Sequence, residues 1–248
     1  MNWSTVGWIV IGLAAILLLV FSWLVNPKEY SLRQQPFVKY LRRSRAATVE
    51  QGRRQQIVLG HTLWSRTYPG LGLSSLAGVS ALLDPENVAD GKTTVSATAG
   101  TLAVFANQII QGRYQDGFSE DLLSSKIHTT VYGPTTFSFT SGLMSDLKMR
   151  PYGTLILLGD FGAESAISVN NIHDQQGDAF AAAGTISAQA VLFPNVKEIL
   201  LGEEVYLASS LIAPNRGQEA SVVVEDLLRT ALILALIVGA VLKALGVL

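Results

Sequence analysis

The chain has 248 residues, 15% of them charged, and a formal net charge of −1. About a quarter of the residues are charged in a typical globular domain, so this low value indicates that part of the chain lies in an apolar environment. The sequence contains no cysteine, which excludes disulfides, thiolate metal sites and cysteine nucleophiles.

The first predicted element is a transmembrane helix within residues 1–27. Residues 6–25 (VGWIVIGLAAILLLVFSWLV) carry no charged side chain, and about twenty apolar residues span a bilayer core. Trp3, Trp8 and Trp23 lie near the ends of this run, where aromatic rings favour the membrane interface. A cleaved signal peptide is the alternative, but no Lys or Arg precedes the run and no A-x-A site follows it.

Residues 28–54 are predicted to form a basic juxtamembrane amphipathic helix. They hold eight of the chain's eighteen Lys and Arg and two of its nineteen acids. The positive-inside rule places this flank in the cytoplasm. Phe37, Val38 and Leu41 start an apolar spacing that suits packing on the bilayer or on the domain. Contacts to lipid head groups are expected from Lys28, Arg33, Lys39, Arg42, Arg43 and Arg45. No nucleic-acid recognition motif is present, so nucleic-acid binding is not expected.

Residues 55–215 are predicted to form one cytoplasmic α/β domain, because short β-rich runs alternate with longer runs of helical periodicity. The expected strands are 56–60, 93–98, 127–132, 154–159 and 179–184. The expected helices are 71–83, 101–113, 136–147, 164–173, one from Ile186 onward, and 196–211. This spacing predicts a mostly parallel open sheet with helices on both faces, a Rossmann-like fold.

A linker at 216–229 leads to a second predicted transmembrane helix at 230–248. Residues 230–248 are apolar except for Lys243, which is six residues from the end and close enough to reach the far head groups. A buried amphipathic helix is the alternative. The sequence therefore predicts a two-pass protein of the inner (plasma) membrane with both termini outside.

Four expected strands run into small or hydroxyl residues just before a helix. Such segments at the carboxyl ends of parallel strands either bind anions on free backbone N–H groups or simply cap the helices. The candidate ligand-binding residues are Thr98, Gly100, Thr101, Gly159, Asp160, Gly162, Glu164, Gly184 and Thr185. Asp160 and Glu164 also offer paired carboxylates, so a metal-dependent hydrolase is a third, weaker possibility.

Other motifs are incomplete. Asp160-Phe161-Gly162 matches the magnesium-binding turn of protein kinases, but the glycine-rich loop and the catalytic loop are missing. Gly70 and Gly72 lack the third glycine of a dinucleotide fingerprint, and there is no G-x-S-x-G or P-loop motif. His61 and His128 lie near strands and could converge on the sheet edge, although ordinary hydrogen bonding is the more typical role of such a histidine. No cofactor and no catalytic residue is predicted.

The stretches LGDFGAES (158–165) and LGEEVYLASSLI (201–212), with AAAGT between them, resemble an uncharacterised prokaryotic family of membrane-anchored α/β domains. The resemblance covers roughly residues 41–214. It implies the architecture above and carries no assigned activity or functional residues.

Two functions are expected from these features. The first is a non-enzymatic, membrane-anchored protein that self-assembles into a homo-oligomeric scaffold at the cytoplasmic face, because both ends are tethered and the domain is poor in charge. The alternative is a sensor that binds a nucleotide or another anionic small molecule at the carboxyl ends of the strands.

Overall fold

The computed structural model describes residues 36–64, 68, 70–83, 93–115 and 129–213, and a few isolated positions (12, 16, 20, 224, 228–230, 232 and 233). The chain divides into one unit of residues 35–213 and another of residues 1–34 and 214–248. Both predicted transmembrane segments fall in the second unit and lie almost wholly outside the described residues. Among the described residues, no helix is long and apolar enough to cross a membrane.

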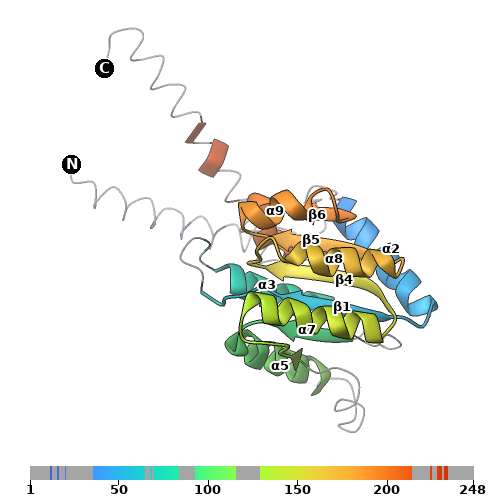
Figure 1. The fold of residues 1–248 in the computed structure, drawn as a ribbon. Coiled ribbons are helices and arrows are strands. Elements are labelled where there is room, and N and C mark those ends of the chain that lie inside the picture. Colours follow the sequence, from blue (N-terminus) through green and yellow to red (C-terminus); the bar gives the residue numbers. More distant parts are fainter. Residues whose placement is uncertain are drawn as a thin grey trace, which may run out of the picture. The chain divides into compact units, whose positions relative to one another are not determined.

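A six-stranded parallel sheet forms the centre of the 35–213 unit (Figure 1). The strand order is β3-β2-β1-β4-β5-β6, which is the order of doubly wound dinucleotide-binding sheets. The strands are β1 (Arg54–Leu59), β2 (Thr93–Ala97), β3 (Thr129–Thr130), β4 (Tyr152–Gly159), β5 (Asp178–Ala183) and β6 (Glu198–Leu200). The predicted α/β class and parallel sheet are confirmed.

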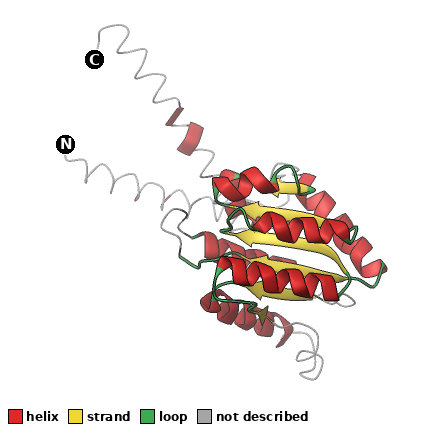
Figure 2. Cartoon of the chain, in the orientation of Figure 1, coloured by secondary structure: helices red, strands yellow, loops and turns green. Residues whose placement is uncertain are grey.

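Helices cover both faces of this sheet (Figure 2). Helices of the first face bury side chains in one core cluster: α2 (Pro36–Glu50), α3 (Leu71–Leu82), α5 (Gly100–Gln115), the 3₁₀ helix η1 (Gly202–Leu207) and α10 (Ala208–Ile212). Helices of the second face bury side chains in the other cluster: α7 (Thr136–Met149), α8 (Ser165–Asp174) and α9 (Ile186–Leu192).

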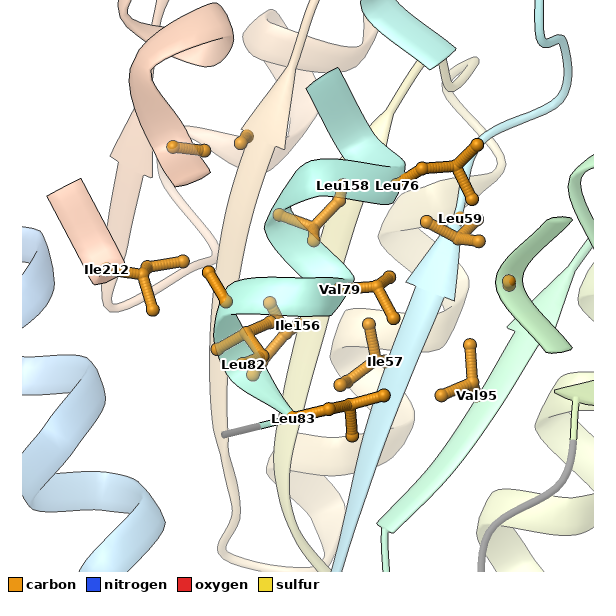
Figure 3. Packing of buried hydrophobic residues seen from close by; sticks show 14 of the residues in the cluster. Ile57, Leu59, Leu76, Val79, Leu82, Leu83, Val95, Ile156, Leu158 and Ile212 are labelled. Carbon is orange, nitrogen blue, oxygen red and sulfur yellow. The ribbon is translucent and has the colours of Figure 1, made fainter. Parts of the chain in front are cut away.

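The central strands are buried on both faces, as expected for a parallel sheet covered by helices. In β1, Ile57 and Leu59 belong to the first cluster and Val58 to the second. Figure 3 shows Ile57 beside Val95 and Ile156, with Val79 and Leu82 of α3 packed over them. Full burial of each such side chain stabilises the fold by about 2 kcal/mol.

The basic segment of residues 28–54 packs on the domain through α2. Phe37 and Leu41 are almost fully buried, and the Phe37 ring meets Phe180 edge-to-face at 5.8 Å. On the same helix, Ser44 and Thr48 share hydrogen bonds of 2.9 and 2.7 Å with the Thr154 hydroxyl of β4. The apolar spacing noted in the sequence therefore faces the sheet.

One predicted helix is wrong. The segment predicted as a helix from 196 to 211 instead forms β6, η1 and the five-residue α10. Gly202 adopts a left-handed φ of +60°, which separates strand from helix and which a continuous helix does not permit. β6 then completes the sheet next to β5.

Candidate functional site

The candidate site lies at the carboxyl edge of the sheet, by which we mean the edge where the parallel strands end. The chain leaves β1 towards α3 on the first face and leaves β4 towards α8 on the second. These strands are neighbours and their connections leave towards opposite faces, which is the topological switch point where open α/β sheets bind ligands. We call this position the β1–β4 crevice.

Two glycines bring the ends of β1 and β4 together. The His61 N–H donates to the Asp160 carbonyl at 2.8 Å, and a Cβ on Gly60 would lie 2.3 Å from the Asp160 nitrogen. Gly159 has a φ of +124°, a conformation that side chains disfavour. This close backbone contact places His61 and Asp160 side by side where the chain leaves β1 and β4.

His61 links two elements by its two ring nitrogens. Nδ1 lies 3.0 Å from Thr98 Oγ1, just after β2, and Nε2 lies 2.7 Å from Glu164 Oε1, just before α8. The Phe161 ring contacts the imidazole edge-on at 5.6 Å. The side chains of His61 and Glu164 are 15% and 10% exposed. Thr98, His61 and Glu164 are therefore joined by hydrogen bonds, and little of the His61 and Glu164 side chains is exposed to solvent.

The two carboxyl groups of the site have pKa values shifted in opposite directions. For Glu164, burial works against ionisation, but hydrogen bonds from its own N–H, from His61 and from the Gly162 N–H hold the pKa below its ordinary value. For Asp160, burial raises the pKa and the charge of Glu164 adds to it, against the opposing effects of His61 and Thr62. Such a divergence within one pair is typical of sites that handle protons or polar ligands.

In the neutral tautomer that suits an ionised Glu164, the two imidazole nitrogens of His61 have different roles. An ionised carboxylate only accepts hydrogen bonds, so Nε2 of a neutral His61 donates to Glu164. Nδ1 then has a free lone pair, and the Thr98 hydroxyl donates to it. Thr98 is 6% exposed, and its hydroxyl oxygen lies 3.0 Å from Nδ1.

The structure brings five of the nine predicted ligand residues together around His61: Thr98, Gly159, Asp160, Gly162 and Glu164. Gly184 and Thr185 hold the backbone that follows β4. The Gly184 N–H donates to the Gly159 carbonyl, and the Thr185 hydroxyl donates to the Phe161 carbonyl. Gly100 and Thr101 begin α5 two and three residues after Thr98, and both are exposed.

A side chain caps α9, and a carboxylate lies at the start of α8. Thr185 Oγ1 accepts from the Ala188 N–H at the start of α9, and the Glu164 carboxylate accepts from the Gly162 N–H beside the start of α8. A carboxylate at this helix end repels an anion. The capping interpretation therefore fits α9, and the Glu164 carboxylate disfavours an anion at α8, which has no side-chain cap.

The basic residues predicted to contact lipid fall into three groups. Lys28 and Arg33 lie outside the described residues, whereas Lys39, Arg42 and Arg43 are exposed on α2. Arg45 requires a correction: it is 8% exposed, and its guanidinium donates to Gln55 Oε1 at 2.8 Å and to the Leu82 carbonyl at 2.7 Å. Because its charge is used inside the domain, Arg45 is not presented to a bilayer.

Space and ligand chemistry narrow what the site can hold. Between α7 and α8, beside His61 and Glu164, there is a cavity of only about 10 Å³, roughly the volume of one water. This cavity is too small to hold a ligand larger than a water molecule. Within the described ranges, no group of three or more His, Asp or Glu side chains is arranged to hold a metal ion.

The sequence named His61 as a histidine that could reach the sheet edge and favoured ordinary hydrogen bonding, but it did not predict Thr98 and Glu164 as its partners. The available signal was the pair Gly60-His61 at the end of β1, since a glycine there permits the close approach to β4. His128 lies outside the described residues. Comparison of the chain with protein-family models, with curated proteins and with solved structures finds no match, so the family resemblance stays a prediction.

Proposed function

We propose that the 35–213 unit is a ligand-binding domain that holds a small, neutral or cationic polar molecule at the β1–β4 crevice. The observation that carries this proposal is the convergence of His61, Asp160 and Glu164 at the topological switch point of the sheet. His61 and Asp160 are the side chains expected to contact the ligand, and Glu164 positions the imidazole.

The chemistry of the crevice supports a ligand that donates hydrogen bonds. The β4–α8 connection offers two carboxyl groups, and burial together with the charge of Glu164 raises the pKa of Asp160 despite His61 and Thr62. A hydroxyl, amino or ammonium group beside Asp160 would stabilise its ionised form. A phosphate there would meet like charge, so the nucleotide version of the sensor is less well supported than a nucleoside, polyol or amine.

We further propose, from the sequence, that this domain is tethered to the cytoplasmic face of a membrane by residues 1–27 and 230–248. The exposed basic residues of α2, namely Lys39, Arg42 and Arg43, are suited to anionic head groups at about 1 kcal/mol each. The domain would then report on a ligand close to the bilayer surface.

The test is thermal unfolding of the full chain in mild detergent with adenosine, glucose, spermidine or ATP. We expect stabilisation by one of the neutral or cationic compounds, because a ligand that binds only the folded state raises its stability. The shift should be lost in Asp160→Asn and His61→Gln, and kept in His173→Gln, a matched change of an exposed histidine on α8. Stabilisation by ATP alone, or equal shifts in all variants, contradicts the proposal.

Self-association is a second candidate, favoured by exposed apolar side chains at the carboxyl edge. Trp64, Phe137 and Ile186 follow β1, β3 and β5 and are 70, 69 and 77% exposed. Exposed apolar groups of this size are typical of contact surfaces. Native mass spectrometry in detergent should show oligomers that the Trp64→Gln, Phe137→Gln, Ile186→Gln triple variant lacks, and a monomer at all concentrations would exclude the scaffold.

A further inference from the structure

We propose that Thr98, His61 and Glu164 form a nucleophile–base–acid chain and that the Thr98 hydroxyl accepts an acyl group from a neutral or cationic ester. This inference rests on the proposed function, since it assigns a substrate class to the same crevice. It is carried by the 3.0 and 2.7 Å hydrogen bonds on the two sides of the His61 ring.

The order of groups is that of a serine-hydrolase triad with the two imidazole nitrogens exchanged. The ionised Glu164 fixes the tautomer by accepting from Nε2 and stabilises the imidazolium that forms when Nδ1 takes a proton. Glu164 is itself held by the Gly162 N–H at 3.0 Å. It therefore acts as a positioning residue, and His61 is the base.

Thr98 lies where a strand turns into a helix, with small neighbours on its carboxyl side. Ala99 and Gly100 follow it, and the first hydrogen bond of α5 runs from the Ala103 N–H to the Ala99 carbonyl. The N–H groups of the three preceding helical residues are therefore not used by the helix. These groups are available to stabilise negative charge on a carbonyl oxygen beside Thr98.

The reaction follows from these positions. Thr98 Oγ1 attacks the ester carbonyl carbon while its proton passes to His61 Nδ1, which gives an imidazolium next to the Glu164 carboxylate. The tetrahedral intermediate collapses, the bond to the leaving alkoxide breaks, and the alkoxide takes the proton from Nδ1. A water molecule, deprotonated by the same nitrogen, then cleaves the acyl-threonine and restores the hydroxyl.

The experiment exposes the full chain in detergent to p-nitrophenyl acetate, with release of p-nitrophenol followed by absorbance. Acid-quenched samples are then digested and searched for an acetyl group on the peptide that contains Thr98. We expect acetylation at Thr98 and a rate about 100-fold lower in His61→Gln, in line with loss of a general base. Thr98→Val, which keeps the shape and removes the hydroxyl, should abolish both signals.

Two variants separate a chemical role from a structural one. Thr98→Ser should retain acetylation and turnover, because a serine hydroxyl can form the same hydrogen bond. Ser145→Ala, which removes an exposed hydroxyl on α7, should behave as wild type. Thermal midpoints of all variants establish that each one is folded.

The outcomes distinguish this inference from the proposed function. If the wild type is stabilised by a neutral or cationic ligand but Thr98 is never acetylated, the acyl-transfer inference is wrong and the binding function stands. If acetylation occurs at other residues equally in Thr98→Val, the inference is also wrong. If there is neither stabilisation nor acetylation, both proposals fail.

Discussion

The two edges of the sheet use charge in different ways. At the amino edge, where the strands begin, Lys197 pairs with Asp178 at 2.8 Å and Arg150 with Asp146 at 3.3 Å, and both cations are about 40% exposed. At the carboxyl edge, His61 and Glu164 are mostly buried, and the first turns of α7 and α9 expose the apolar side chains of Phe137 and Ile186. Solvated ion pairs add little to stability, whereas a sheltered pair of this kind has to be fully hydrogen-bonded. The comparison shows that the ionisable side chains of the candidate site contact one another, whereas those of the amino edge are largely solvated.

The largest difference between the edges is expected for glycine substitutions. Gly60→Ala at the carboxyl edge puts a methyl group 2.3 Å from the Asp160 backbone and should destabilise the domain by about 3 kcal/mol. Gly52→Ala at the amino edge meets no atom within 4 Å and has only its φ of +65° against it, so about 1 kcal/mol is expected. Urea unfolding measures the free energy of unfolding that each variant loses. Equal losses would contradict the close backbone contact after the ends of β1 and β4.

A buried arginine near the amino edge provides the next test. Arg45→Met should cost about 2 kcal/mol, because it leaves Gln55 Oε1 and the Leu82 carbonyl without their donor. Arg43→Met changes an exposed neighbour and should stay within about 0.5 kcal/mol. Binding to vesicles with anionic lipid should show the reverse ranking. A loss of vesicle binding without a loss of stability in Arg45→Met would restore the original lipid interpretation.

The carboxylate of the candidate site should matter more than that of a surface pair. Glu164→Gln is expected to cost about 1 kcal/mol at neutral pH, and Asp178→Asn, the control, less than about 0.5 kcal/mol. Because the folded pKa of Glu164 is lowered, its contribution is present above its ordinary value of 4.5 and is lost as pH falls below it. Unfolding curves of wild type and Glu164→Gln should therefore converge in acid, and parallel curves at all pH values would be inconsistent with this assignment.

Asp160 should give the smallest effect, with the opposite sign. Its folded pKa is raised, so its favourable contribution exists below its ordinary value of 3.8 and is lost as pH rises through the folded value. Asp160→Asn should therefore be slightly more stable than wild type at neutral pH, and the gain should vanish in acid. Asp174→Asn, an exposed change on α8, is the control. A clear destabilisation by Asp160→Asn at neutral pH would mean that its charge is satisfied in the free protein.

The sequence allowed five strands and most helices to be predicted because apolar runs of the right length were separated by glycine and proline. β6 was missed because its run of apolar residues continues into the helical periodicity of the next segment, and periodicity cannot assign so short a strand. Gly202, which adopts a left-handed φ, was the residue in the sequence that could have marked the end of this strand. The topology also predicted that Asp160 and Glu164 would lie at the carboxyl edge, but the partners of His61 depend on distances across three chain connections, which no local pattern encodes.

The outermost strands limit how copies of this domain can join. β3 has two residues and β6 three, so each border of the sheet presents only a few unpaired main-chain groups. Strand addition needs a long, accessible border. The described borders of this sheet therefore offer little template for strand addition or for growth into cross-β fibres.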